Sequence, residues 1–363
     1  MIRLIKPYIS YKEVEADFRK IFESGIFTKG EYVNKFVKEI KSYVGSKYAF
    51  LTTSATTALT MCLKILNIQP GDEVIVSDFS FPATVNVVED LGAKPVFADV
   101  SLDTFNMLPD ELEKKITNKT KAVIFVDALG NPSGVTQIKE ICDKYNVPLI
   151  EDAACAIGSS EFGKKCGNIA DLTCFSLHPR KLLTTGEGGA ITTNNSDFAK
   201  LLSVKLNHGA VIEDGKFEFI DYGFNYRLPE LQCAMGIVQL KKLDLIVEER
   251  VLIRDVISDY ISDFGFIPQK ITSNVTHNIQ SLVFKVPKSI SRDGLITFLK
   301  DNNIETTIGT YCLSNTQYYR EKYNTIQKNA KLLEENTITL PCYTDLDTDK
   351  VLSNIGNYVK KVR

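Results

Sequence analysis

The chain has 363 residues, of which 44% are hydrophobic and 24% charged, and its formal net charge at pH 7 is −2. This composition is typical of a globular protein, and the length leaves room for one large and one small domain. A near-neutral chain without a basic stripe is a poor match for nucleic acid, and its apolar runs fall short of the ~20 residues that a membrane span requires. We therefore expect neither nucleic acid nor a membrane as a partner.

The N-terminal segment and the cysteines both favour a reducing compartment. Residues 1–8 contain no apolar signal core, so we expect a cytoplasmic protein. Eight cysteines are scattered along the chain without a CxxC pair, and only three histidines are present. This pattern suggests neither a zinc site nor a redox motif, and we expect no metal. The cysteines are expected to be buried thiols.

Strands and helices alternate in the first half of the chain. Apolar runs predict strands at residues 48–52, 73–77, 95–100, 121–126 and 148–152, and helical patterns predict helices at 55–66, 82–91 and 137–145. Such continuous apolar runs are typical of parallel strands buried on both faces, and intervening helices indicate crossover units. The sequence therefore predicts an α/β fold with a mostly parallel sheet between helices.

The pattern changes in the second half. A strand at 189–193 and a helix at 197–207 precede one long predicted helix over 229–255, and short elements such as a strand at 280–286 and a helix at 292–302 follow. This mixture predicts a smaller α+β domain. We place the boundary inside the long helix, with a large domain at 1–245 and a small one at 246–363.

Lys181 and Asp152 carry the strongest chemical signal. Lys181 lies in the stretch 175–189, FSLHPRKLLTTGEGG, and Asp152 ends a predicted strand upstream. Pyridoxal phosphate (PLP) requires an amine for a Schiff base and an anion for its ring nitrogen. The pair therefore predicts a PLP enzyme in which both residues are catalytic. Taken singly, they would read as a surface lysine and a helix N-cap; Glu151 would point to the opposite face of the strand.

Other residues are candidates for the remaining cofactor contacts. Ala55 and Thr56 open a predicted helix directly after a strand, where free N–H groups and the helix dipole favour a phosphate. The Ser176 hydroxyl can add a further donor. Phe81 follows another strand end and is predicted to stack on the cofactor ring, with a core aromatic as the alternative reading.

Together these residues resemble the DegT/DnrJ/EryC1/StrS family of sugar aminotransferases, nearly from end to end. The matching blocks are GDEVI at 71–75, LGAKPVF at 91–97, EDAA at 151–154, the lysine stretch at 175–189, NHG at 207–209, GFNYRL at 223–228 and LP at 340–341. The resemblance implies the PLP-dependent transferase fold of type I, with a seven-stranded sheet in the large domain. It also implies transfer of an amino group from glutamate to a nucleotide-linked keto-deoxy sugar for amino-sugar and surface-glycan biosynthesis. A 4-keto sugar is favoured and a 3-keto sugar is the alternative.

The resemblance also implies roles for individual residues. Lys181 forms the Schiff base, Asp152 pairs with the ring nitrogen, Phe81 stacks, and Thr56 and Ser176 bind the phosphate. Family enzymes are homodimers with shared active sites, and Asn225 matches the asparagine that reaches the cofactor phosphate of the other subunit.

The sequence departs from the family pattern at three positions. Ala55 replaces a common glycine, Leu177 replaces a common phenylalanine, and Cys155 replaces a common glutamine that contacts the ring hydroxyl. A thiol is a weaker hydrogen-bonding group than an amide, which puts the Cys155 contact in doubt.

Three alternatives and one further residue remain open. Related sugar dehydratases carry histidine at the position of Lys181, so the retained lysine favours a transaminase. A dehydratase, an enzyme acting on amino acids alone and a non-catalytic regulatory protein are the alternatives. Tyr311 is a candidate contact for the nucleotide, or a packing residue.

Overall fold

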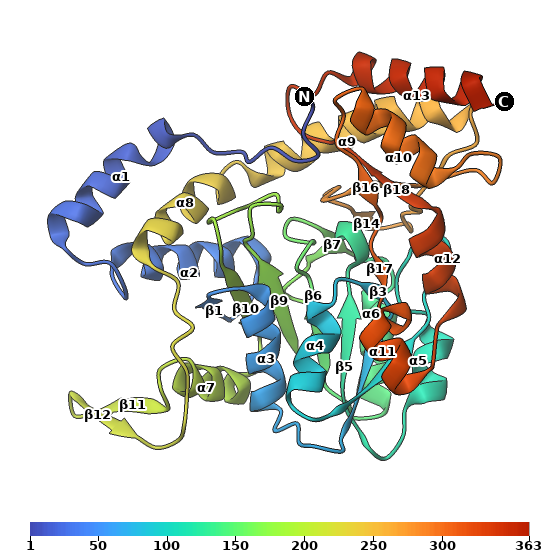
Figure 1. Ribbon diagram of the computed structural model, residues 1–363. Helices are drawn as coiled ribbons and strands as arrows, with labels where there is room; N and C mark the ends of the chain where they lie inside the picture. The colour runs from blue at the N-terminus through green and yellow to red at the C-terminus, as the bar shows by residue number, and fades with distance from the viewer. Residues whose placement is uncertain (363) are drawn as a thin grey trace.

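A seven-stranded sheet forms the centre of the computed structural model, which describes residues 1–362 (Figure 1). In spatial order its strands are β1 (Tyr48–Thr52), β10 (Gly189–Thr193), β9 (Leu172–Ser176), β6 (Leu149–Asp152), β5 (Thr120–Val126), β2 (Glu73–Ser77) and β4 (Lys94–Ala98). All neighbouring pairs from β9 to β4 are parallel, whereas β10 is antiparallel to both β1 and β9. The predicted α/β class and mostly parallel sheet are confirmed.

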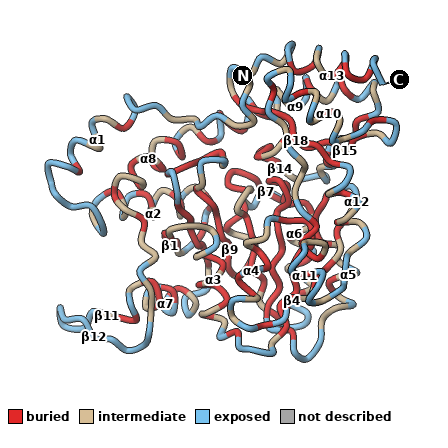
Figure 2. Tube along the Cα trace, in the orientation of Figure 1, coloured by how far each residue is buried: buried red, intermediate tan, exposed pale blue. Residues whose placement is uncertain are grey.

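Helices cover both faces of this sheet because its buried residues alternate between two cores. Val74 and Val76 of β2 pack in one core, and Ile75 between them packs in another. The first face is covered by α3 (Ala55–Ile65), α4 (Ala83–Asp90) and α7 (Ser196–Lys205). The second is covered by α2 (Glu31–Val44), α5 (Pro109–Lys115), α6 (Val135–Lys144) and α8 (Glu230–Leu240), with α1 (Tyr11–Ser24) packed outside them. Figure 2 shows the sheet as the most continuously buried part of the chain.

A smaller unit with its own core follows in the C-terminal part. It contains an antiparallel sheet in the order β13 (Ile267–Pro268), β15 (Leu282–Lys285), β18 (Thr337–Leu340) and β16 (Thr307–Ile308). The helices α9 (Leu243–Ser262), α10 (Arg292–Asp301) and α13 (Thr348–Val362) pack on it. Ile2 bridges to Ile304, so the start of the chain also lies on this unit. The domain boundary near residue 245 stays a prediction.

Further short elements lie outside the two main sheets. They are β3 (Phe79–Ser80) paired with β17 (Tyr311–Cys312), the set β7 (Ser160–Glu161), β8 (Lys164–Lys165) and β14 (Val275–Thr276), the hairpin β11 (Ala210–Glu213) and β12 (Lys216–Phe219), and the helices α11 (Gln317–Tyr323) and α12 (Lys328–Asn336). The β11–β12 hairpin projects away from the rest of the chain (Figure 1). Within residues 1–362, no helix has the length and apolar character that a membrane crossing demands.

The prediction of one long helix over residues 229–255 is wrong. Lys242 leaves helical geometry (φ −111°, ψ 8°), so α8 ends at Leu240 and α9 begins at Leu243. Ile237 of α8 packs in the core beneath the large sheet, whereas Ile257 of α9 packs in the C-terminal core. Leu243 and Ile246 at the start of α9 still pack in the core beneath the large sheet, so α9 itself runs from one core to the other. No glycine or proline marks the break in the sequence.

Asp78 ties the end of β2 to the C-terminal part. Its buried carboxylate accepts hydrogen bonds from the Ser314 amide (2.7 Å), the Ser314 hydroxyl (2.6 Å) and the Cys312 thiol (3.2 Å). Burial raises the pKa of the Asp78 carboxyl from 3.8 to about 7, in spite of the opposing hydrogen bonds from Ser314. The folded protein therefore binds this proton more tightly than the unfolded chain does.

We expect Asp78→Asn to change the pH dependence of stability. Because the pKa of Asp78 is higher in the folded state than in the unfolded state, Asp78 contributes to the free energy of unfolding in full below about pH 4. This contribution is lost as the pH rises through 7. Between pH 5 and pH 8 the wild type should lose on the order of 3 kcal/mol relative to the variant. Urea unfolding of both proteins across this range measures the difference. Parallel pH profiles would contradict the assignment.

Candidate active site

A cavity of about 500 Å³ lies at the carboxyl ends of the parallel strands, against the C-terminal unit. This edge of a parallel sheet is where α/β proteins bind ligands. Seven of the eight predicted site residues line it, namely Ala55, Thr56, Phe81, Asp152, Cys155, Ser176 and Lys181. Gln280, Gly309 and Leu340 contribute to the wall from the C-terminal side. The structure thus brings together residues that are far apart in the sequence.

Lys181 extends from the loop that follows β9. Its Nζ donates a hydrogen bond to Cys155 Sγ at 3.0 Å, and its backbone amide donates to the His178 carbonyl at 2.9 Å. The amine is half-buried on the cavity wall. Cys155 therefore contacts the lysine amine, and its contact with a ring hydroxyl stays a prediction.

Asp152 lies at the end of β6 and is 4% exposed. Its Oδ2 accepts a hydrogen bond from Thr84 Oγ1 at 2.7 Å, and its Oδ1 accepts from the Ala154 amide at 3.2 Å. Burial raises the pKa of the Asp152 carboxyl, and these hydrogen bonds and the Lys181 charge oppose that rise only in part. A cation in the cavity would stabilise the carboxylate, and a protonated ring nitrogen is a cation of this kind.

The N-terminus of α3 presents unused donors to the cavity. Ser54 caps the helix, since its Oγ accepts from the Thr57 amide at 3.1 Å, and Thr57 Oγ1 in turn accepts from the Ser54 amide. Among the described residues, no acceptor contacts the amides of Ala55 and Thr56. Such a helix end suits a phosphate, and Ser176 lies on the same cavity.

Gly189 allows β10 to lie close to the start of α3. It begins β10 opposite Thr52, and a Cβ placed there would lie 2.5 Å from the Ser54 carbonyl carbon and oxygen. Only glycine allows β10 to pass so close to the helix start. Gly189 therefore also shapes the phosphate end of the cavity.

Phe81 and Asn225 occupy contrasting positions. The Phe81 ring is 65% exposed on the cavity and packs edge-on against Tyr311, with ring centres 6.4 Å apart. Tyr311 is therefore a packing partner of Phe81, and its contact with a nucleotide stays a prediction. Asn225 is exposed and does not line the cavity of its own chain.

Two residues that contact Asp152 or the backbone beside Lys181 were not predicted from the sequence. Thr84 holds Asp152 from α4, and Gln280 holds the backbone beside Lys181. A threonine in a first helical turn and a lone glutamine before a strand carry no sequence signal for such roles.

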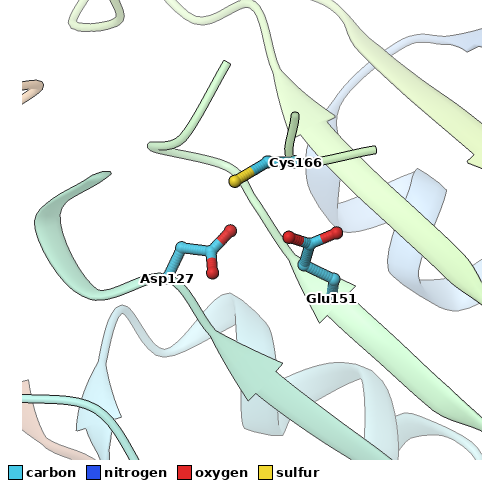
Figure 3. Close-up of side chains that lie close together, drawn as sticks. All are labelled: Asp127, Glu151 and Cys166. Carbon is cyan, nitrogen blue, oxygen red and sulfur yellow. The ribbon is translucent and has the colours of Figure 1, made fainter. Parts of the chain in front are cut away.

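Asp127, Glu151 and Cys166 form a buried cluster (Figure 3), in which one side-chain oxygen or sulfur atom from each residue lies within 4.8 Å of the others. Glu151 Oε2 accepts from Thr173 Oγ1 at 2.7 Å and from the Gly167 amide at 3.2 Å. Within residues 1–362, both Asp127 oxygens and Glu151 Oε1 have no hydrogen-bond partner. Burial and the neighbouring Glu151 carboxylate raise the pKa of Asp127 well above its usual value. Asp127 lines the cavity, whereas Glu151 does not.

The chain is similar to known proteins over nearly its whole length. A model of the DegT/DnrJ/EryC1/StrS aminotransferase family matches residues 9–359. The GDP-perosamine synthase of Vibrio cholerae is 31% identical, over 99% of this chain and 98% of that protein. The aminotransferase PseC of Helicobacter pylori, which is involved in pseudoaminic acid biosynthesis, superposes with a TM-score of 0.91 at 27% identity, over 99% of this chain and 98% of that one.

A third relative bears on the cofactor. The putative sugar aminotransferase Spr1654 of Streptococcus pneumoniae, solved in a PMP form, superposes with a TM-score of 0.92 at 26% identity over the whole of both chains, and a PLP form is also known. The cavity fits that cofactor, because it offers the Lys181 amine, the buried Asp152 carboxylate that a cation would stabilise, and free amides at the start of α3. The cofactor is pyridoxal phosphate, and the chain belongs to the DegT/DnrJ/EryC1/StrS aminotransferase family.

Proposed function

We propose that this enzyme transfers an amino group from glutamate to a nucleotide-linked keto-deoxy sugar, for amino-sugar and surface-glycan biosynthesis. The observation that carries the proposal is the meeting of the Lys181 amine and the Asp152 carboxylate in one cavity. The sugar acceptor is supported by the relatives named above, a GDP-perosamine synthase and an enzyme of pseudoaminic acid biosynthesis. A 4-keto acceptor is favoured over a 3-keto acceptor.

Lys181, Asp152 and Phe81 each have a separate role in this reaction. PLP supplies the aldehyde that carries the amino group and the ring that accepts electrons. The Lys181 amine holds that aldehyde and later moves a proton at the substrate carbon. Asp152 holds the proton on the ring nitrogen, because a charge pair at ~4 Å contributes about 4 kcal/mol at an effective dielectric near 20. Phe81, on the cavity wall, would cover one face of the cofactor ring.

The phosphate is anchored at the opposite end of the cavity. The free amides of Ala55 and Thr56 and the hydroxyl of Ser176 bind its oxygens, aided by the positive end of the α3 dipole. Ala55 has no glycine-like freedom, but its methyl group leaves the backbone amide available.

We further propose a homodimer with shared active sites. Asn225 is exposed and lies between the β11–β12 hairpin and α8, outside the cavity of its own chain. The hairpin exposes Ile212 (65%), Phe217 (60%) and Phe219 (70%), and Figure 2 shows its projecting end in pale blue. Apolar side chains gathered on a projecting element are typical of an interface. A solution mass of a single chain would exclude this arrangement.

The visible absorption spectrum of the protein with PLP, before and after addition of glutamate, tests the function. We expect a Schiff-base band that bleaches with glutamate, after which a panel of nucleotide-linked keto-sugars identifies the acceptor that restores it. A band indifferent to glutamate would contradict glutamate as the donor. The absence of any band would favour the regulatory alternative, and the retained Lys181 argues against the dehydratase.

A further inference from the structure

Gln280 contacts both peptide groups of Lys181. Its Oε1 accepts a hydrogen bond from the Leu182 amide at 2.9 Å, and its Nε2 donates to the Arg180 carbonyl at 2.7 Å. The peptide bonds on either side of Lys181 are thus held by one side-chain amide, which is 4% exposed and comes from the C-terminal part of the chain.

Gln280 is itself rigidly held. Its backbone amide donates to Asn278 Oδ1 at 2.8 Å, and its carbonyl accepts from Arg250 Nη2 at 3.0 Å. Ile279, which lies between Asn278 and Gln280, has a φ of 52°, a left-handed conformation that is strained for a β-branched residue. The Ile279 carbonyl accepts from Arg250 Nε at 2.8 Å and from Nη2 at 2.6 Å, so the buried guanidinium stabilises the strained turn. Strain of this kind persists where surrounding contacts fix the backbone.

The same turn also holds the second loop of the site. Asn278 Nδ2 donates to the carbonyls of Cys155 (2.9 Å) and Ile157 (2.8 Å). Cys155 is the residue whose thiol contacts the Lys181 amine. Residues 278–280 therefore fix the lysine backbone and the nearest neighbour of its amine relative to each other.

A second glutamine provides a natural comparison. Gln239 of α8 is fully buried, and its Oε1 accepts from the Thr184 amide at 3.1 Å while its Nε2 donates to the Thr184 carbonyl at 2.5 Å. It makes the same kind of two-way contact with the same loop, but at Thr184 rather than at Lys181. Loss of Gln239 should therefore loosen the loop without releasing the peptide groups of the lysine.

We propose that Gln280 is a positioning residue for Lys181, which aims the amine by fixing both of its peptide groups. This inference rests on the proposed function. A lysine side chain has four rotatable bonds, so the direction of its Cα–Cβ bond decides which part of the cavity the amine reaches. A displacement of ~1 Å at a reacting group costs roughly 100-fold in rate.

Four proteins test the proposal: the wild type, Gln280→Leu, Gln280→Glu and the control Gln239→Leu. Gln280→Glu keeps the acceptor for the Leu182 amide and loses the donor to the Arg180 carbonyl, so it serves if Gln280→Leu does not fold. The first measurement is hydrogen exchange at the Leu182 amide without PLP. We expect exchange at least ~10-fold faster in Gln280→Leu than in the wild type, and little change at Leu182 in the control.

The second measurement is the pH titration of the Schiff-base band with PLP bound, together with kcat. We expect the Gln280 variants to shift the titration midpoint by about one pH unit and to lower kcat roughly 100-fold, while Gln239→Leu titrates like the wild type. A purely structural role would lower the thermal stability of both leucine variants and leave the titrations unchanged.

Three outcomes would overturn the inference. Unchanged exchange at Leu182 would show that Gln280 does not restrain the lysine backbone. If the wild type forms a normal Schiff-base band and the Gln280 variants titrate in the same way, this inference is overturned and the proposed function stays intact. A wild type that forms no Schiff base would overturn the proposed function, and the inference with it.

Discussion

Replacing Lys181 with alanine is expected to lower kcat by at least about 10⁴-fold, because the variant loses both the group that holds the aldehyde and the base that moves the proton. The free amides of Ala55 and Thr56 remain, so PLP should still bind through its phosphate. Steady-state assay with glutamate and a keto-sugar acceptor, alongside PLP binding by equilibrium dialysis, measures both effects.

Lys181→Arg is the matched control. The guanidinium keeps the positive charge that faces Asp152 but stays protonated at neutral pH and cannot act as a nucleophile. We therefore expect it to be as inactive as Lys181→Ala. If arginine restored activity, the role of the residue would be its charge alone, and normal turnover in Lys181→Ala would remove the residue from the mechanism.

The same variant tests the shared site. In a mixed dimer of Lys181→Ala and Asn225→Asp chains, one site carries both changes and the other carries neither if Asn225 acts across the interface. Co-expression should then recover activity that neither variant has alone. If Asn225 acts within its own chain, the mixture contains no intact site and stays inactive.

Asp152→Asn is expected to lower kcat by about 10³-fold, because the neutral amide removes a charge pair worth roughly three pKa units at the ring nitrogen. Burial already disfavours the Asp152 charge, so the PLP-free variant should be at least as stable as the wild type. Turnover and urea unfolding of the same preparation measure the two effects. A kcat within tenfold of the wild type would contradict the assignment.

Thr84→Val provides the control for Asp152. It removes the 2.7 Å hydrogen bond to Asp152 Oδ2 and keeps the carboxylate. The loss of one hydrogen bond to a charged group is worth about 1.5–3 kcal/mol, so we expect kcat to fall much less than in Asp152→Asn. Equal losses in the two variants would indicate that orientation, and not charge, is what Asp152 contributes.

The fold was predictable where local patterns carry it. The sequence pattern predicted β2 and β10 with their observed bounds, and all five residues of each strand are buried. The central strand β9 was missed, since its residues 172–176 run into the stretch that was interpreted as the lysine loop. The break between α8 and α9 was missed because no glycine or proline marks it in the sequence.

The site divides in the same way. Lys181 and Asp152 were predictable because Asp152 ends a predicted strand, Lys181 lies in a stretch rich in glycine and threonine, and each offers a group with one obvious chemical use. Gln280 was not, since it contacts the lysine backbone across 98 residues of chain and an amide has no motif of its own. Thr84 and Gln239 share this property, since their roles exist only once the chain has folded.

The place of β1 at the edge of the large sheet also constrains the order of folding. Its one neighbour in the sheet is β10, so β1 and the start of α3 cannot join the sheet until about 140 further residues have been synthesised, which takes on the order of 10 s at ordinary translation rates. By then the lysine stretch between β9 and β10 has also left the ribosome. The phosphate end and the amine end of the cavity therefore form in the same late event, and a nascent chain that has not reached β10 should have no affinity for PLP.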